Sequence, residues 1–357
     1  MQTTWNFFLK SSDAWESMLA DIAGAKSSID IEQYIIGIDE ISGRFFELLK
    51  KKKKEGVAVR LLCDGAGSFD LLNSASANEL ITQWIELKFF NPIKPWRVGN
   101  FSSWFLRDHR KLMVVDKKIG HVGGVGIEKR MENWRDTHVR IEGSVVTAIQ
   151  DAFDKMWNAA PKKIHFRFKK CDLPGADFSF VTNAPRFRGR CIYHDIRRAI
   201  RGARRYIYFT TPYFVPSIRL FSSLIRAAKR GVDVRLLLPE NSDVRVADIA
   251  AGSYFHLALK AGIRIYLYGK GRILHAKCGV IDDKWSTVGS ANLDNLSLLL
   301  NYEGNIVSAD RSFVVELKGQ FMEDLASARE ISHGEWARRP FFRKILEFIS
   351  WPFHQAL

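Results

Sequence analysis

The chain has 357 residues, of which 46% are hydrophobic, which is ample for two domains or for one large domain built from two halves. Its 54 basic and 39 acidic residues give a net charge of +15, which favours anionic partners, either nucleic acid or acidic lipid headgroups. Charged residues interrupt every apolar run before the roughly 20 residues that a membrane span needs. Residues 1–9 also lack the pattern of a secretory signal. We therefore expect neither a signal peptide nor a transmembrane helix, and a protein of the cytoplasm, soluble or attached to a membrane face.

The four cysteines are Cys63, Cys171, Cys191 and Cys278, and none of them has CxxC spacing. Cys63 and Cys278 lie within apolar, strand-like runs. Buried free thiols in a reducing compartment are therefore expected in preference to disulfides.

The first half begins as a strand, a helix and a second strand. Residues 25–31 predict a strand, residues 42–55 a helix, and residues 56–62 a buried strand with alternating valine and leucine. Gly56 fits the position just after the helix, where glycine is common. The run of lysines at 50–54 closes this helix and is interpreted as a solvated helix end, with a lipid-binding patch as the alternative.

The second half repeats this order. Residues 203–209 resemble 25–31, residues 219–230 predict the helix, and residues 231–237 repeat the pattern of 56–62. The β-α-β-α-β order predicts a largely parallel sheet flanked by helices in each half. The fold class is therefore α/β, with two α-β-α sandwich domains fused in pseudo-twofold symmetry around one shared active site.

A polar, lysine-rich segment near residues 161–174 is expected to join the two halves. We place the first domain at residues 1–165 and the second at 166–357. The arginine-rich stretch 186–205 has apolar residues at helical intervals and predicts an ordinary amphipathic helix, in preference to a nucleic-acid site.

Two further segments are candidates for membrane contact. In residues 340–352, apolar side chains cover one helical face and polar ones such as Arg343, Lys344, Glu347 and Ser350 the other, as in a helix that lies in a membrane interface. A helix packed on the protein's own core has the same pattern. Residues 89–105 place aromatic residues among basic ones ahead of His109, and fit either a headgroup boundary or a loop that covers the core.

The pattern His-x-Lys-x-x-x-x-Asp occurs in each half. Its six residues are His109, Lys111 and Asp116 in the first copy, and His275, Lys277 and Asp282 in the second. A glycine follows each aspartate by seven residues, and leads into Gly123-Gly124 and into Gly289-Ser290-Ala291-Asn292. Two such copies are very hard to obtain by chance, and they indicate phosphodiester chemistry.

Side chains two apart on a strand share a face, so each histidine projects with its lysine. Both pairs are expected to converge on one phosphate diester. One neutral imidazole would attack phosphorus, and the opposite one would act as general acid and base. The lysines, with Ser290 and Asn292, would hold the charge on the phosphate oxygens, so that no metal or other cofactor is expected. Asp116 and Asp282 lie at odd intervals from their histidines and are expected to anchor loops.

Each histidine also needs a partner that fixes its tautomer. Asp136 lies 27 residues after His109, and Glu303 lies 28 residues after His275. We assign each acid to Nδ1 of the histidine of its own half; surface carboxylates are the alternative.

At these residues the chain resembles the phospholipase D superfamily, and more narrowly the bacterial cardiolipin synthases, in their shorter form without N-terminal transmembrane helices. The resemblance extends from about Ser12 almost to the end of the chain, and is supported by residues 134–143, 211–216, 274–277 and 338 onward. It implies a phosphatidyltransferase that joins two phosphatidylglycerols into cardiolipin, or uses phosphatidylethanolamine as a donor. His109 would carry the phosphatidyl group and His275 would act as acid and base.

One departure from the family pattern concerns the first motif. Gly124 stands in the glycine pair, and Gly126 occupies a position where relatives commonly have asparagine, so the two halves are expected to be unequal. The resemblance further implies anionic phospholipids and the membrane surface as partners, no nucleic acid, and a peripheral location on the cytoplasmic side of the cell membrane. It leaves the oligomeric state open.

Three alternatives remain. A hydrolytic phospholipase D would release phosphatidic acid from the same intermediate, because water competes with a lipid hydroxyl for it. A metal-independent nuclease fits the basic charge but not the segments shared with lipid synthases. A non-catalytic lipid-binding module would need a degenerate motif, and both motifs are intact.

Overall fold

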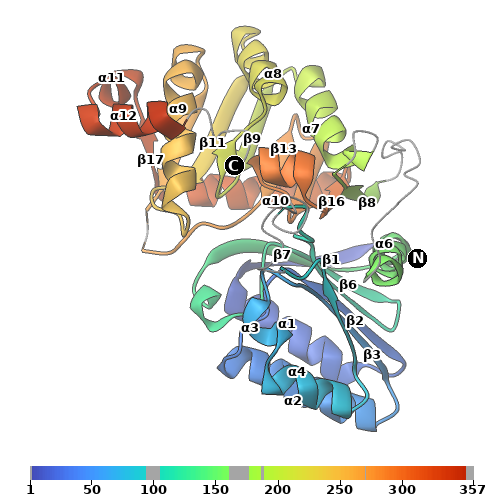
Figure 1. Cartoon of the computed structure of the whole chain (residues 1–357). Helices are drawn as coiled ribbons and strands as arrows, with labels where there is room; N and C mark the ends of the chain where they lie inside the picture. Colours follow the sequence, from blue (N-terminus) through green and yellow to red (C-terminus); the bar gives the residue numbers. More distant parts are fainter. Residues whose placement is uncertain (1, 94–104, 161–176, 186–188, 270, 351–357) are drawn as a thin grey trace.

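The computed structural model describes residues 2–93, 105–160, 177–185, 189–269 and 271–350. It is a mixed α/β structure of two stacked halves, each built on one sheet (Figure 1). The expected joining segment 161–174 lies outside the described residues, so the domain boundary after residue 165 stays a prediction.

The elements of the first half are β1 (Thr4–Lys10), α1 (Ser11–Gly24), β2 (Ser28–Gln33), α2 (Glu40–Lys54), β3 (Ala58–Asp64), α3 (Phe69–Leu72), α4 (Ala75–Thr82), β4 (Glu86–Phe90), β5 (Lys111–Val115), β6 (Ile119–Gly123), η1 (Lys129–Met131), β7 (Arg135–Glu142) and α6 (Val145–Ala159).

Those of the second half are β8 (Phe178–Asn183), α7 (Cys191–Gly202), β9 (Tyr206–Thr210), β10 (Phe214–Val215), α8 (Ile218–Lys229), β11 (Asp233–Pro239), α9 (Arg245–Lys260), β12 (Arg264–Tyr268), β13 (Cys278–Ile281), β14 (Trp285–Gly289), β15 (Leu293–Asp294), η3 (Leu296–Leu300), β16 (Glu303–Ser308), α10 (Arg311–Leu325), β17 (Ala328–Ile331), α11 (His333–Ala337) and α12 (Phe341–Ser350).

The same strand arrangement occurs in both sheets, as the internal repeat predicts. In the described residues the first sheet has the order β1-β7-β6-β5-β2-β3-β4, and the second β17-β12-β11-β9-β13-β14-β16-β8. The run β6-β5-β2-β3-β4 therefore corresponds to β14-β13-β9-β11-β12. The predicted α/β fold of two related halves is confirmed.

The prediction of largely parallel sheets is wrong. Strands β2, β3 and β4 are parallel, as are β9, β11 and β12, but the strands that follow each histidine motif are antiparallel. Strands β5 and β13 also run antiparallel to β2 and β9. A tight hairpin at each motif's end then reverses the next strand: Asp116 and Lys117 have φ of 52° and 55°, and Asp282 and Asp283 both have φ of 56°. Two consecutive residues with positive φ form the turn that matches the twist of paired antiparallel strands. Neither pair carries the Asn-Gly sequence that announces such a turn.

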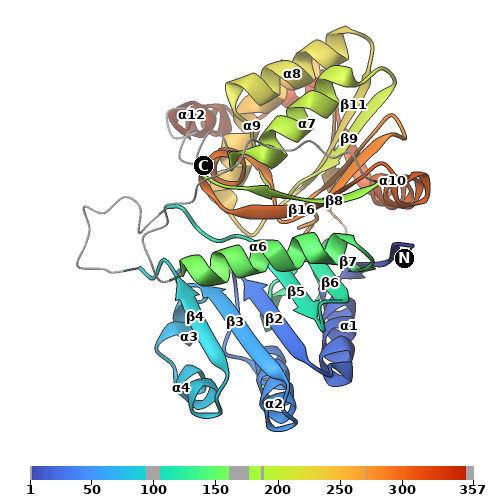
Figure 2. The same ribbon diagram turned by 90° about the vertical axis from the view of Figure 1, so that its right-hand side faces the viewer.

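Two helices lie between the sheets and unite the halves. Figure 2 shows α6 running along the boundary, and α10 occupies the corresponding place in the second half. Side chains from both halves form one buried cluster there, including Val114, Ile149, Val280 and Phe313. The halves thus share a core, which fixes their relative position.

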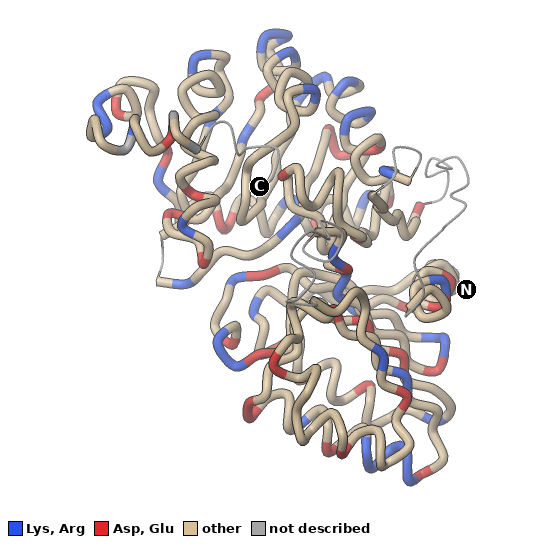
Figure 3. The backbone as a smooth tube through the Cα atoms, in the orientation of Figure 1, with Lys and Arg blue, Asp and Glu red and all other residues tan. Residues whose placement is uncertain are grey.

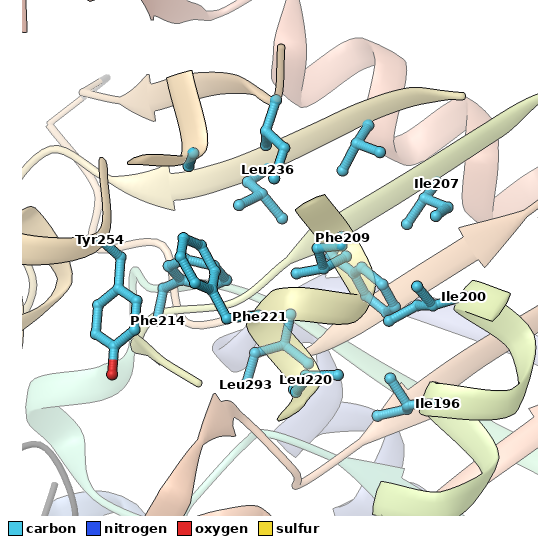
Figure 4. Close-up of a cluster of buried hydrophobic side chains, with 14 of the residues drawn as sticks. Ile196, Ile200, Ile207, Phe209, Phe214, Leu220, Phe221, Leu236, Tyr254 and Leu293 are labelled. Atoms are coloured by element: carbon cyan, nitrogen blue, oxygen red, sulfur yellow. The ribbon is translucent and has the colours of Figure 1, made fainter. Parts of the chain in front are cut away.

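Helices α7 and α8 of the second half pack against its sheet through buried apolar side chains. Figure 4 shows side chains of α7, α8 and the neighbouring strands in one cluster, among them Ile196, Leu220 and Leu236. The arginine-rich stretch is therefore an amphipathic helix over the described α7, as predicted.

Charge is distributed over both halves, with acidic residues among the basic ones (Figure 3). At the end of α2, Lys50 pairs with Glu47 and Glu79, and Lys52 pairs with Glu55. Lys50 and Lys52 are buried, whereas Lys51 and Lys54 are exposed, so the prediction of a solvated helix end holds for only part of the lysine run.

The cysteine prediction is correct for two residues and wrong for one. Cys63 and Cys278 are free and buried. Cys191 is disulfide-bonded; Cys171 lies outside the described residues. Sequence spacing did not reveal this bond, because a disulfide requires only that two Cα atoms come within about 7 Å in the fold.

Candidate active site

His109 lies two residues before the start of β5 and His275 three residues before the start of β13, and each is held by backbone of the opposite half. The His109 amide donates to the carbonyl of Tyr302 at 2.9 Å, and the His275 amide donates to the carbonyl of Arg135 at 2.7 Å. The corresponding bridges, Asp108 to Tyr302 and Arg135 to Leu274, are both parallel. The site is therefore assembled from both halves by main-chain hydrogen bonds.

Each histidine takes its acidic partner from the other half. Nδ1 of His109 lies 3.0 Å from Oε1 of Glu303, and Nδ1 of His275 lies 2.8 Å from Oδ2 of Asp136. The prediction that each acid serves its own half's histidine is wrong, although both acids do contact Nδ1 of a motif histidine. The main-chain bridges explain the exchange, because each acid is the next residue after the bridging position of its own half.

Each motif lysine is bonded to the backbone of its own histidine. Nζ of Lys111 donates to the carbonyl of His109 at 2.8 Å, and Nζ of Lys277 donates to the carbonyl of His275. Burial, together with the charge of Lys277, lowers the pKa of Lys111 to about 7, although Glu303 opposes the shift. Burial also lowers the pKa of Lys277, to about 8. The charge of Lys277 therefore acts on Lys111 although the two lysines belong to different halves, and an anion bound near both would relieve this repulsion.

Both imidazoles are neutral in the substrate-free site. Burial, and then the charges of Lys111 and Lys277, hold the pKa of His109 well below its ordinary value. Burial and Lys277 lower the pKa of His275 to about 4. A neutral ring with its Nδ1 proton directed at an oxygen of its acidic partner leaves the Nε2 lone pair available for attack.

The two acids differ in their surroundings. Burial raises the pKa of Glu303 to about 8, although Lys111 and the Ser290 hydroxyl oppose this. Burial also acts on Asp136, but Lys277 and His275 outweigh it and keep the pKa of this carboxyl below its usual range. Burial thus favours the protonated form of Glu303 near neutral pH, whereas Asp136 presents a negative charge to His275.

The difference between Gly124 and Ser290 follows from the length of the acid beside each. The Ser290 hydroxyl donates to Oε2 of Glu303 and accepts from the amide of Gly304. A Cβ atom on Gly124 would lie 2.4 Å from Oδ1 of Asp136, so a side chain there would occupy the place of that carboxylate. The Asp136 carboxylate occupies the space where a side chain at position 124 would lie, so glycine is required there. The Glu303 carboxylate instead accepts a hydrogen bond from the Ser290 side chain, so serine fits at position 290.

Asn292 and Gly126 confirm that the halves are unequal. Nδ2 of Asn292 donates to the hydroxyl of Ser297 at 3.1 Å. In the first half, a Cβ on Gly126 would lie 3.1 Å from the sulfur of Met131, and the Gly126 carbonyl accepts from Nε1 of Trp15. At position 126 the first half thus offers only main-chain atoms, which pack against Met131 and Trp15, whereas Asn292 gives the second half a side-chain amide at the corresponding position.

The aspartates of the motifs anchor loops, as predicted. Asp116 accepts hydrogen bonds from the amides of residues 26, 27 and 28, and Asp282 from those of residues 204, 205 and 206. Asp116 follows the last residue of β5 while Lys111 is its first, so these carboxylates lie at the far end of the strand from the histidines. They hold the hairpin turn against the start of the neighbouring strand.

Sequence reasoning missed two tyrosines at the histidines. The ring of Tyr34 meets that of His109 edge-on with centroids 4.7 Å apart, and Tyr213 meets His275 at 6.5 Å. The hydroxyl of Tyr213 donates to Asp243 at 2.7 Å. The signal was available in the repeat, because each tyrosine follows the corresponding strand, β2 or β9.

Comparison with known proteins agrees with this geometry. A family model described as the cardiolipin synthase, PLD-like domain matches residues 18–157 and 196–325, and both histidine motifs lie within these ranges. The chain belongs to this family. It is therefore an enzyme of a phospholipid transferase family, with the phospholipase D-like domain present twice.

Named relatives cover most of the chain. The major cardiolipin synthase ClsA of Bacillus subtilis is 33% identical over 351 residues, which are 95% of this chain and 72% of that protein. A cardiolipin synthase of Clostridium perfringens strain 13 is 31% identical over 369 residues, which are 97% of this chain and 75% of that protein.

Solved structures share the fold at low sequence identity. The phosphatidylserine synthase of Haemophilus influenzae has a TM-score of 0.76 at 13% identity, and the match covers 99% of this chain and 93% of that one. The polyphosphate kinase of Porphyromonas gingivalis has a TM-score of 0.62 at 11% identity, covering 99% of this chain and 53% of that one.

The contact between Gly124 and Asp136 gives a testable expectation. Gly124→Ala should displace the Asp136 carboxylate from His275 and lower turnover by roughly 100-fold, because a shift of about 1 Å in a catalytic group has effects of this size. Circular dichroism and thermal unfolding should show the fold retained. Gly43→Ala in α2 is the matched control, since no atom lies within 4 Å of a Cβ there. Wild-type turnover in Gly124→Ala would show that the carboxylate's position is unimportant.

Proposed function

We propose that the protein makes cardiolipin from phosphatidylglycerol by transferring a phosphatidyl group through His109. The observation that supports this most strongly is the pair of buried, neutral imidazoles from different halves, each held at Nδ1 by an acid of the other half. Two such groups can divide one displacement at phosphorus into two successive ones.

In the first step Nε2 of His109 attacks phosphorus, a P–N bond forms, and the bond from phosphorus to the glycerol oxygen breaks. His275 gives its proton to the departing oxygen, so that glycerol leaves as a neutral alcohol. The bound diester carries a negative charge, which raises the pKa of His275 and allows the ring to hold this proton. Asp136 stabilises the resulting imidazolium.

In the second step a hydroxyl of another phosphatidylglycerol attacks the same phosphorus. His275, now neutral, removes the hydroxyl proton as the P–O bond forms and the P–N bond to His109 breaks. Lys111 and Lys277 would hold the charge that develops on the phosphate oxygens. For Ser290 and Asn292 to do so as well, their donors would have to turn from Glu303 and Ser297 to the bound phosphate. No metal or other cofactor enters either step, and the absence of one remains a prediction.

The reaction is tested with purified protein and vesicles of phosphatidylglycerol. We expect release of glycerol and formation of a four-chain lipid in equal amounts, measured by enzymatic glycerol assay and mass spectrometry. Phosphatidic acid as the sole lipid product would replace this proposal with a hydrolytic phospholipase D. A mixture with phosphatidylethanolamine shows whether that lipid also serves as a donor, and plasmid nicking without metal tests the nuclease alternative.

The lysine pKa values predict how activity changes with pH. Lys277 has a pKa of about 8 and Lys111 of about 7 in the free enzyme, so each loses its positive charge as the pH rises through that value. We expect kcat/KM, which reports the free enzyme, to begin to fall above about pH 7, as Lys111 loses its charge, and to fall more steeply above about pH 8, as Lys277 does. The fall in kcat should come at higher pH, because the bound phosphate favours the charged lysines. A kcat/KM that stays constant to pH 9.5 would contradict this role of the lysines.

We further propose that anionic phospholipids of a membrane surface are the protein's partners, at the cytoplasmic face, without involvement of nucleic acid. Within the described residues, no helix has both the length and the apolar character needed to cross a bilayer. The bond at Cys191 bears on the choice of face, because disulfides persist mainly in oxidising compartments. Alkylation of cells before lysis distinguishes the faces: a reduced Cys191 supports the cytoplasmic side, and an oxidised one contradicts it.

A further inference from the structure

The C-terminal helix α12 presents its apolar side to solvent. Phe341, Phe342, Ile345, Leu346 and Ile349 are between 37% and 75% exposed. At 100° per residue these positions fall within one arc of the helix, so they form a continuous apolar strip, here called the α12 strip. A helix packed on its own core would bury this strip, so the alternative left open by the sequence does not apply to these five residues.

The attached side of α12 is polar. Glu347 lies nearly opposite the α12 strip and is 3% exposed. Its carboxylate accepts hydrogen bonds from Nε and Nη2 of Arg339 at 3.0 Å and 2.6 Å. A Cβ on Gly252 of α9 would lie 2.7 Å from Oε1 of Glu347, so the glycine makes the room that this carboxylate needs.

Arg339 in turn links α12 to helix α9 through Trp336. The Arg339 guanidinium lies over the ring of Trp336 at 5.0 Å, and Trp336 meets Phe255 of α9 at 4.8 Å. A buried ion pair adds little net stability over apolar packing of the same volume, but it fixes orientation, because a rotated helix would leave its charges unpaired. The Arg339–Glu347 pair thus holds α12 with its apolar side outward.

We infer that the α12 strip inserts into the surface of an anionic bilayer. This inference rests on the proposed function, which requires that a lipid reach the histidines. Basic side chains accompany the strip: Arg338 and Lys344 are exposed, and the chain carries a net charge of +15. An apolar strip with flanking cations is the composition of helices that lie in the headgroup region.

A second copy of the chain is a poorer binding partner for the α12 strip than a bilayer is. A helix of 10 residues is about 15 Å long and about 10 Å wide, so the α12 strip offers a footprint of about 150 Å². A stable protein interface needs about 800 Å² from each partner. A bilayer has no such requirement, because insertion depends on the few side chains that enter it.

The test measures cosedimentation of the full-length protein with vesicles of phosphatidylcholine containing phosphatidylglycerol. The variant Phe341→Ser/Phe342→Ser/Ile349→Ser should bind at least about tenfold more weakly than wild type, since each change removes apolar area from the interface. The control variant Ile81→Ser/Trp84→Ser/Val315→Ser removes equally exposed apolar groups from other elements and should bind like wild type. Hydrogen exchange of residues 341–350 should slow when vesicles are added to wild type.

Two further measurements separate the possible failures. Turnover of a short-chain phosphatidylglycerol below its micelle concentration should be unchanged in the α12 variant, because that substrate needs no membrane. A wild type inactive on this substrate and on vesicles alike would contradict the proposed function. Equal vesicle binding by the α12 variant and wild type would overturn the inference alone. So would a wild-type dimer in sedimentation velocity that the α12 variant converts to a monomer, because the strip would then bind a second copy.

Discussion

His109→Ala is expected to abolish covalent labelling by a phosphatidylglycerol whose phosphatidyl group is radiolabelled. The P–N bond cannot form without Nε2 of this ring, so turnover should fall by roughly 10⁴-fold or more. His275→Ala should behave differently, because the nucleophile remains but the leaving glycerol receives no proton. Slow labelling without release is expected for it. Quenched samples separated by denaturing gel electrophoresis would measure both.

His121→Ala is a useful control for this pair of variants. His121 is also buried and also contacts an acid, with Nε2 2.7 Å from Oδ2 of Asp21, but it lies on β6 outside both motifs. Labelling and release should both persist in this variant, within the limits of its stability. If His275→Ala were the variant that loses labelling while His109→Ala retains it, the two roles would be exchanged.

The exchange of acids between halves makes the second large prediction. Glu303→Gln should impair labelling, like His109→Ala, because an amide cannot ionise to balance the positive charge that the His109 ring gains as the P–N bond forms. Asp136→Asn should permit labelling and slow release, like His275→Ala. Replacing a carboxylate by an amide in a comparable arrangement costs up to about 10⁴-fold in kcat. Pre-steady-state labelling and release rates distinguish the two variants.

The opposite result would show that each acid serves its own half in solution. In that case Asp136→Asn would lose labelling and Glu303→Gln would lose release. Glu316→Gln is the matched control, since this carboxylate accepts from Nε1 of Trp5 at an exposed position away from the histidines. It should leave both rates unchanged.

The repeat and the motif residues could be predicted from the sequence because they depend on short intervals. A valine-leucine strand after a glycine, or a lysine two residues after a histidine, requires only local geometry. The loop-anchoring role of Asp116 and Asp282 followed from the same kind of argument. The mixed direction of the strands did not. It depends on the antiparallel pairing of β5 with β2 and of β13 with β9, and on a hairpin turn at Asp116-Lys117 whose sequence is unusual for that turn.

The pairing of acids with histidines could not be predicted for a different reason. Asp136 and Glu303 lie at similar distances downstream of the two histidines, so the sequence offers two symmetrical assignments. The choice is made by main-chain bridges between segments 139 and 194 residues apart, at Arg135–Leu274 and Asp108–Tyr302. Contacts between residues so far apart in the chain leave no pattern in the neighbouring sequence from which they could be predicted.

The outward orientation of α12 was likewise undecided by its sequence. An apolar strip predicts burial in either protein or lipid, and the outcome depends on Gly252 and Arg339, which receive Glu347 and so fix the opposite side against the protein.

The central claim is that both imidazoles act on one phosphorus atom. A crystal structure of the enzyme with orthovanadate, which adopts the five-coordinate geometry of phosphoryl transfer, tests it most directly. The predicted result is a single vanadium bonded to Nε2 of His109, with Nε2 of His275 at the opposite apical oxygen and both lysines at the equatorial oxygens. Vanadate bound to one half alone, or one vanadate in each half, would contradict it.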